Sequence, residues 1–189
     1  MALTGDRLPE VRAQRVALRW LTAADTDDIF RIYSDPEVMA YWSTVPMKER
    51  AQAGELIASV HRLYAEHSLY EWGVVRLEDE RTIGTLTLAS IDTSNKRTEI
   101  GFALARDAWG QGFMREAVTA GIDFAFDTLG LQRIEADVDP DNAASLRLLD
   151  TLGFVREGLL RERWRVGGGV QDSVMLGLLR REWTARDRG

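Results

Sequence analysis

Cysteine is absent from this chain of 189 residues, and histidine occurs only twice. Without cysteine there can be no disulfide, no thiolate metal site and no cysteine nucleophile. The two histidines, His61 and His67, lie six residues apart, so they do not share the helical face of an i, i+4 metal-binding pair. We therefore expect no metal site.

Long apolar runs are also lacking, since none approaches the roughly 20 residues that a membrane-spanning helix needs. The first fifteen residues contain no hydrophobic signal core, so the expected compartment is the cytoplasm. Basic residues are in the minority: 24 Lys and Arg against 30 Asp and Glu give a net charge of −6. This balance argues against a nucleic acid or an anionic membrane as the main partner. It suits a cationic substrate better, although the same charge also serves solubility.

Ordinary globular composition, with 45% hydrophobic residues, predicts one sizeable domain over residues 1–189, with a core at about 15–180. Alternation and spacing of apolar residues predict the elements. Strands are expected at 15–21, 70–77, 81–91, 96–104, 133–138, 154–166 and 170–179. Helices are expected at about 22–35, 47–68, 112–127 and 142–152, and the tail 180–189 is expected to fray. Short polar connections predict antiparallel hairpins between the three strands from 70 to 104.

The stretch Glu99–Glu116 combines an apolar strand, a Gly-x-Gly turn at Gly110 and Gly112, and the start of a helix. The first N–H groups of a helix lack partners within it, and glycine lets an anion approach them, so this unit predicts a phosphate site. It is no dinucleotide fingerprint, because the third glycine would fall at Arg115, and no P-loop lysine follows. Taken alone, the turn could also be purely structural.

A second motif follows at Asp139–Phe154, where Asn142 could be simply the N-cap of a short helix that contains Ser145. Together the two motifs resemble the GCN5-related N-acetyltransferase (GNAT) superfamily, and the resemblance extends from Arg15 to Leu179. It is strongest to the branch that acetylates ribosomal-protein N-termini, which also holds many enzymes of unassigned substrate. The pieces that carry it are Glu99-Ile100-Gly101-Phe102, Trp109 to Ala117, Asn142-x-x-Ser145 and Leu152-Gly153-Phe154.

The resemblance implies an α+β fold in three layers, with a mixed, strongly bent sheet flanked by helices, and acetyl-CoA as co-substrate. The pyrophosphate would sit on the backbone amides of Gln111, Gly112, Phe113, Met114 and Arg115. The pantetheine arm would pair like an added strand with Ile100, Gly101, Phe102, Ala103 and Leu104. Asn142 would bind the pantetheine region, and Ser145 would lie near the thioester sulfur. This chain departs from the family pattern by carrying Met114 where a small residue is usual.

The reaction needs a base, because an amine with a lysine-like pKa of about 10.4 is protonated near neutral pH. Glu99 is the candidate, since it enters the strand expected to hold the thioester carbonyl and shares a face with the small residues Gly101 and Ala103. It could equally be a surface glutamate. Possible substitutes for it are Asp35, Glu37, Glu135, Asp137 and Asp139.

Ser145 could protonate the departing thiolate or hydrogen-bond to the sulfur, and the N–H of Phe102 could polarise the carbonyl. With no cysteine, few histidines and no Gly-x-Ser-x-Gly motif, an acyl-enzyme is not expected. Direct attack in a ternary complex is what remains.

The acceptor is expected to be a primary amine, either a protein or peptide N-terminus or a small amine such as a polyamine or an aminoglycoside. Tyr41, Trp42 and Trp72, with Tyr70, are candidates for binding its cation, although Tyr41 and Trp42 could also be core anchors. Two rival interpretations stay open: an acyl-CoA-binding or interaction domain without turnover, and a nucleotide-phosphate enzyme that uses the glycine turn. Monomer and homodimer are both compatible with the sequence.

Overall fold

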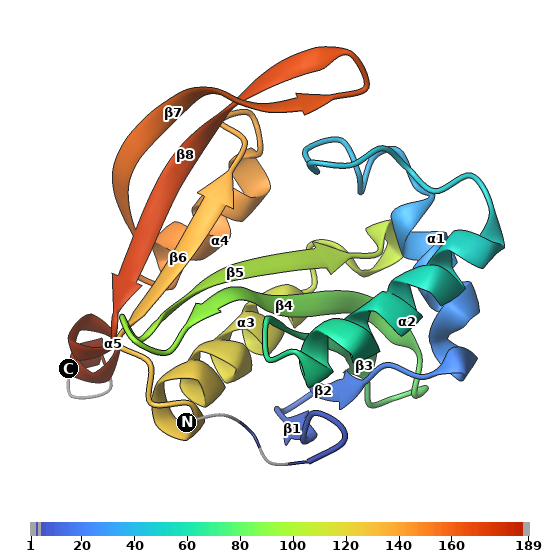
Figure 1. Ribbon diagram of the computed structural model, residues 1–189, viewed down its shortest axis with the longest axis horizontal. Helices are drawn as coiled ribbons and strands as arrows, with labels where there is room; N and C mark the ends of the chain where they lie inside the picture. The colour runs from blue at the N-terminus through green and yellow to red at the C-terminus, as the bar shows by residue number, and fades with distance from the viewer. Residues whose placement is uncertain (1–2, 4, 187–189) are drawn as a thin grey trace.

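A single mixed sheet of eight strands organises the molecule, in the order β1-β2-β3-β4-β5-β6-β8-β7 (Figure 1). The structure is a computed structural model that describes residues 3 and 5–186. Its strands are β1 (Val11–Arg12), β2 (Val16–Trp20), β3 (Leu69–Arg76), β4 (Thr82–Asp92), β5 (Arg97–Leu104), β6 (Arg133–Val138), β7 (Val155–Val166) and β8 (Gly169–Leu179). Its helices are α1 (Thr26–Tyr33), α2 (Arg50–Ala65), α3 (Phe113–Asp123), α4 (Ala143–Thr151) and α5 (Arg180–Arg186), with short turns η1 (Ala23–Asp25), η2 (Arg106–Ala108) and η3 (Phe124–Thr128).

Apolar spacing explains the local structure. In α2 the buried residues Ala53, Ile57, Val60 and Tyr64 recur every three or four positions and form one helical face. In β6, by contrast, every second residue is buried, as expected for a strand with one face on the core. The sequence therefore specifies both periods clearly, and the expected order of elements is confirmed.

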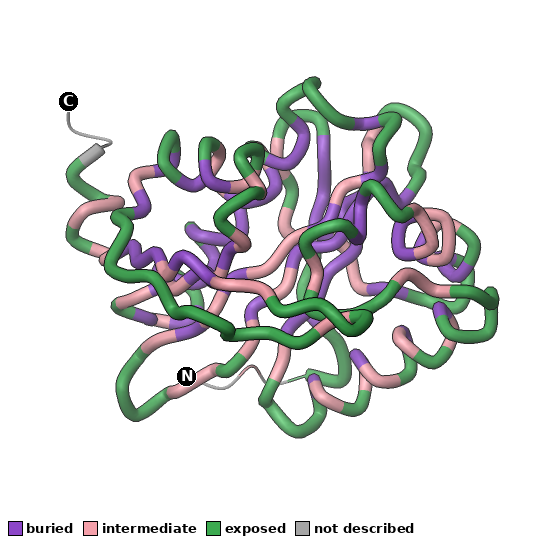
Figure 2. Tube along the Cα trace, turned by 90° about the horizontal axis from the view of Figure 1, so that it is seen from above, coloured by how far each residue is buried: buried purple, intermediate pink, exposed green. Residues whose placement is uncertain are grey.

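Two hydrophobic clusters lie on opposite sides of the sheet. One joins α1 and α2 to the sheet through residues such as Ile29, Ile57 and Ala103, and the other joins α3 and α4 to it through Val118, Leu149 and Ile100. Figure 2 shows the buried segments gathered in the middle of the molecule, with exposed segments around them. The sheet is thus the middle of three layers, as the fold class predicted.

The sheet opens between β5 and β6, its one parallel pair in the described part of the chain. These strands pair only at Arg97 with Arg133, Thr98 with Ile134 and Glu99 with Glu135. β5 then continues to Leu104 alongside β4, while β6 continues to Val138 alongside β8, and the two diverge (Figure 1). The split leaves one edge of β5 without a neighbouring strand from Ile100 onward.

Two details differ from the expectations. The short strand β1 was not predicted, because two residues are too few to show a period. The prediction of a frayed tail was wrong for Arg180–Arg186, which form α5; its remaining residues lie outside the described part. Trp183 Nε1 donates to Asp123 Oδ1 at 2.7 Å, which ties α5 to the end of α3. No helix in residues 5–186 is both long and apolar enough to span a membrane.

Candidate active site

A cleft of about 160 Å³ lies in the split between β5 and β6. It brings together eight of the residues that the sequence singled out: Tyr41, Trp42, Glu99, Ile100, Gly101, Phe102, Asn142 and Ser145. Its other walls come from β6, from β8 and from Trp164 of β7. Segments far apart in the chain therefore meet where the sheet opens.

The glycine turn leads directly from β5 into α3. Gly110 and Gly112 have φ angles of +72° and +82°, a left-handed region that side chains with a Cβ rarely adopt. Gly112 is the N-cap of α3, and the N–H of Glu116 donates to the Gly112 carbonyl at 3.2 Å. The preceding amides, those of Phe113, Met114 and Arg115, belong to the first turn and have no partner within the helix. They form the local geometry of an anion site.

The side chain of Met114 does not obstruct this turn. It is 7% exposed and packs into the core, where its Cε would lie 3.3 Å from a Cβ placed on Gly84. Gly84 of β4 has no side chain, and a Cβ there would also collide with the Ala103 carbonyl oxygen. Met114 therefore packs beside a glycine of β4. The Trp109 side chain is exposed, and its Nε1 donates to the Leu104 carbonyl at 2.7 Å.

Asn142 and Ser145 stand on the β6 side of the cleft. The Asn142 side chain accepts a hydrogen bond from the Ser145 N–H at 3.1 Å, so it does cap α4. The two interpretations of Asn142 are compatible, since both side chains also line the cleft. Capping by Asn142 fixes the start of α4 and thereby the position of Ser145.

Two carboxylates face this space from the two diverging strands. Glu99 of β5 is partly buried, and its pKa is raised above the ordinary value by burial first and then by the negative charge of Asp137. Asp137 of β6 accepts hydrogen bonds from the Ser173 hydroxyl, from Trp164 Nε1 at 3.3 Å and from Arg163 Nε at 3.4 Å. Asp137 is thus held by three donors, whereas Glu99 is distinguished by its raised pKa.

The other substitutes for the base lie in less suitable surroundings. Asp35 pairs with Arg106 at 3.1 Å, and Glu135 pairs with both Arg97 and Arg133 at 2.8 Å. Glu37 is exposed and does not line the cleft. Asp139 does line it. Of the candidate bases that the sequence offered, Glu99, Asp137 and Asp139 therefore line the cleft, and Asp137 is engaged by three donors.

The proposal that Trp72 and Tyr70 bind substrate was wrong. Trp72 is fully buried, stacks edge-on against Phe124, and its Nε1 donates to the Pro9 carbonyl at 2.9 Å. Tyr70 is 2% exposed in the same core cluster. Both lie on one face of strand β3, where Trp72 packs against Phe124 of η3 and Tyr70 against Tyr64 of α2. An aromatic residue in a central strand is a core residue unless the sheet opens beside it.

The sequence did not single out the contribution of the last hairpin. Trp164, Gln171, Asp172 and Ser173 line the cleft although the pattern around them indicated only a hairpin. A Cβ placed on Gly167 at the hairpin tip would lie 3.8 Å from Val45, so the tip reaches the 36–46 loop. In Figure 1 the hairpin of β7 and β8 extends towards that loop. Only an aromatic residue beside a triple-glycine turn could have suggested this.

In the described part of the chain, two buried acids lie outside the cleft: Asp25, which pairs with Arg19, and Glu71. Glu71 of β3 is 5% exposed, and burial raises its pKa to about 7. It bonds with Thr87, which the register places between Glu71 and Gly101. Because Glu71 does not line the cleft, it is no direct rival to Glu99.

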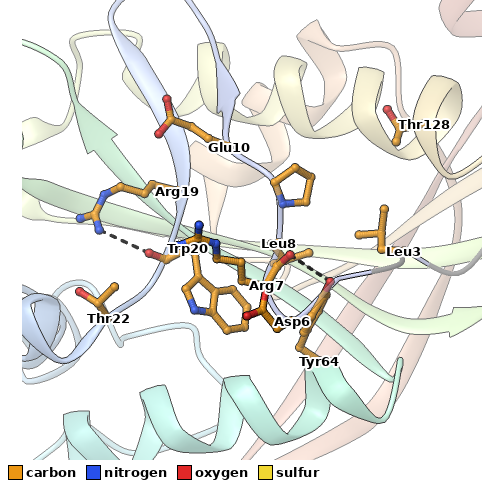
Figure 3. Close-up of a pocket in the computed structure, with 11 residues that line it drawn as sticks. Leu3, Asp6, Arg7, Leu8, Glu10, Arg19, Trp20, Thr22, Tyr64 and Thr128 are labelled. Carbon is orange, nitrogen blue, oxygen red and sulfur yellow. Dashed lines mark hydrogen bonds between the residues drawn. The ribbon is translucent and has the colours of Figure 1, made fainter.

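A larger hollow of about 880 Å³ lies elsewhere, between the N-terminal segment, Trp20 and Tyr64 (Figure 3). Some of its polar groups bond to one another: Arg19 Nη1 donates to the Trp20 carbonyl at 3.3 Å, and the Tyr64 hydroxyl donates to the Arg7 carbonyl at 3.1 Å. It is lined by none of the candidate site residues. The cleft at the split is therefore the better candidate for the active site.

Comparison with known proteins agrees with this geometry. The family model of the acetyltransferase (GNAT) domain matches residues 15–155, which include the glycine turn, Glu99, Asn142 and Ser145. The chain belongs to the GNAT family. As a member of it, the protein is an acetyltransferase, and the resemblance seen in the sequence is confirmed.

Among its GNAT relatives is the uncharacterized N-acetyltransferase p20 of Bacillus licheniformis, 39% identical over 90% of this chain and 96% of p20. Solved structures with the same fold include spermidine N-acetyltransferase from Vibrio cholerae in complex with CoA and spermine, with a TM-score of 0.80 and 24% identity over 90% of this chain and 98% of that one. Mycobacterium smegmatis RimJ in complex with CoA-disulfide has a TM-score of 0.83 and 22% identity over 92% and 87%. At these identities the two structures support the fold alone.

Proposed function

We propose that this protein transfers the acetyl group of acetyl-CoA to a primary amine of a small cationic acceptor, by direct attack in a ternary complex. The observation that carries the proposal is the split between β5 and β6, because Glu99, Asn142 and Ser145 line one cleft there. Glu99 belongs to β5, the strand that leads into the glycine turn. Membership of the GNAT family supports the reaction class.

The donor side fits acetyl-CoA. The left-handed Gly110 and Gly112 present the amides from Gln111 to Arg115 as a cradle for a diphosphate, and no bulky side chain enters it from Met114. The free edge of β5 from Ile100 to Leu104 could pair with the two amides of a pantetheine arm. Acetyl-CoA supplies an activated acetyl group on a thioester with a thiolate leaving group.

The acceptor side favours a cation. Four carboxylates, Glu99, Asp137, Asp139 and Asp172, line the cleft together with the aromatic rings of Tyr41, Trp42 and Trp164. Negative charge and aromatic faces both attract an ammonium group. A polyamine is our first candidate class, in keeping with a 26% identical relative named spermidine N(1)-acetyltransferase from Vibrio cholerae. A protein N-terminus is the alternative, in keeping with the 32% identical putative ribosomal N-acetyltransferase YdaF of Bacillus subtilis.

In the proposed reaction Glu99 accepts the proton that the ammonium group must lose before its nitrogen can act as a nucleophile. Its raised pKa brings it closer to the pH at which it works. Gly101 leaves open space beside Glu99, because a Cβ there would have no neighbour nearer than 4.0 Å. Ser145 Oγ would donate a hydrogen bond or a proton to the leaving thiolate.

An amine panel with detection of free thiol tests the proposal. Purified protein and acetyl-CoA are incubated with polyamines, aminoglycosides and peptides that begin with serine or alanine. We expect thiol release above background with at least one polyamine. Release with peptides alone would overturn the choice of acceptor, and CoA binding without release from any amine would support a binding domain. A melting temperature raised by ATP or NAD and not by CoA would overturn the donor assignment.

A further inference from the structure

Arg15, just before β2, makes an unusual number of contacts with the glycine turn. Its backbone N–H and its Nε both donate to the carboxylate of Glu116, the latter at 3.0 Å. Its Nη1 donates to the carbonyl of Gln111 at 3.1 Å. The guanidinium also lies over the ring of Phe113, with 4.9 Å from Cζ to the ring centroid. Arg15 thus contacts the turn at Gln111 and the first turn of α3 at Phe113 and Glu116.

Glu116 makes this arrangement matter for anion binding. It lies in the first turn of α3, one helical turn from Gly112, and its side chain is 16% exposed. An unpaired carboxylate there would repel a diphosphate placed on the same N–H groups. Arg15 cancels that charge locally, and its own side chain remains 49% exposed.

Arg15 also touches the turn at its most constrained point. A Cβ placed on Gly112 would lie 3.3 Å from Arg15 Nη2, so the guanidinium covers the outer side of that glycine. The hollow on this side, of about 500 Å³, is lined by Arg12, Arg15 and Arg115 as well as Glu116. The turn is therefore supported from outside by a cation while its amides remain free for a ligand.

We propose that Arg15 is a positioning residue of the donor site: paired with Glu116, it holds the glycine turn in shape and neutralises the carboxylate that would otherwise repel a diphosphate. This inference rests on the proposed function, since the diphosphate is that of acetyl-CoA. Arg15 should therefore affect the binding of donors that carry the diphosphate and should not affect contacts with the thioester end of the donor.

Binding measurements on four proteins test it: wild type, Arg15→Ala, Glu116→Gln and the double variant. Calorimetry gives the Kd of CoA, and the thiol assay gives KM for acetyl-CoA and for acetyl-pantetheine, which lacks the diphosphate. We expect Arg15→Ala to raise the Kd of CoA about tenfold, equivalent to about 1.4 kcal/mol of binding free energy. It should change KM for acetyl-pantetheine less than twofold. The double variant should bind CoA at least threefold more tightly than Arg15→Ala, because it lacks the carboxylate that repels the diphosphate.

The asymmetry between partners is the decisive readout. If the ion pair only stabilised the fold, Arg15→Ala and Glu116→Gln would reduce CoA affinity equally. We expect Arg15→Ala to raise the Kd of CoA at least fivefold more than Glu116→Gln does. Equal losses, or equal effects on both donors, would overturn the inference. Arg15→Lys keeps the charge without the forked contacts and should fall between wild type and Arg15→Ala. It also serves if Arg15→Ala unfolds.

Arg12→Ala is the matched control, because Arg12 lines the same hollow but pairs with Glu10 at 2.5 Å. Its CoA affinity should stay within twofold of wild type, and a tenfold loss would show that general positive charge, not Arg15, is responsible. If wild-type protein fails to bind CoA, the proposed function itself fails. If wild type binds CoA and Arg15→Ala binds it equally, only the present inference fails.

Discussion

The two sides of the split are built in different ways. The proposed donor side is a continuous stretch, Glu99–Glu116, whose proposed binding groups are backbone amides and a free strand edge. The acceptor side draws side chains from the 36–46 loop, from β6 and from the hairpin of β7 and β8. Any sequence with the same fold presents the same backbone groups, whereas the side chains differ between sequences and can select the substrate. One side can therefore be common to a family while the other sets which amine is used.

The two sides also differ in how they are held. Arg15 and two left-handed glycines fix the donor turn. The acceptor side is held by polar contacts around Asp137 and by the approach of the hairpin tip to Val45. Substitutions on one side should therefore change the kinetics of one substrate and leave those of the other largely unchanged.

Glu99→Gln should have the largest effect, because Glu99 lies where the two sides meet. Removing a general base costs about 10²-fold or more in kcat/KM. Burial and Asp137 raise the pKa of Glu99 above the ordinary glutamate pKa of 4.5. In the wild-type pH profile of kcat/KM, the acid limb should therefore lie above pH 4.5, with activity rising as the carboxyl ionises. The variant should lose that limb and follow the free amine alone, measured as a pH profile of kcat/KM.

Glu135→Gln is the control for this experiment, since Glu135 of β6 lies opposite Glu99 at the start of the split but pairs with Arg97 and Arg133. It should keep the limb. A Glu99→Gln profile that retains the limb would move the base to Asp137 or Asp139.

Gly112→Val should weaken the binding of acetyl-CoA tenfold or more, which corresponds to a loss of about 1.4 kcal/mol of binding free energy. Valine is strained at the φ of +82° and its side chain would press on Arg15 Nη2. KM for the amine should change little. The measurement is the Kd of CoA by calorimetry, with Gly54→Ala as the folding control, because a Cβ at Gly54 meets nothing within 4 Å. Unchanged CoA affinity would contradict the assignment of the cradle.

Trp164→Ala should have the smallest effect and act only on the acceptor. Loss of one aromatic face costs about 0.5–1 kcal/mol, so KM for the amine should rise roughly two- to fivefold. KM for acetyl-CoA should remain the same, and Trp164→Phe should restore most of the loss. Val170→Ala, an exposed position on the same hairpin, is the control. A change confined to acetyl-CoA would reverse the assignment of the two sides.

The fold and the donor side were largely predictable, because they depend on short-range patterns. Alternation located β6, three- and four-residue spacing located α2, and glycine chemistry located the turn. The strand β1 and the helix α5 escaped prediction because α5 is secured by a distant partner, through Trp183 and Asp123, and β1 by pairing with β2.

The acceptor side was predictable only in part. Tyr41 and Trp42 do line the cleft, but Trp72 is a core residue, and Trp164 and Asp172 were not singled out. Nothing local distinguishes a tryptophan that faces a cleft from one that faces a core. The difference depends on which neighbouring strand is missing, and that is a property of the sheet.

From the sequence alone follow the family, the order of most elements and the expectation of an amide cradle at Gly112, because each depends on residues that are close in the chain. Only the tertiary structure decided that β5 and β6 separate after Glu99, that Asp137 and Trp164 join the same cleft, and that Arg15 neutralises Glu116. These contacts join residues between 27 and 101 positions apart. The packing of the whole sheet brings them together, and no local pattern records it.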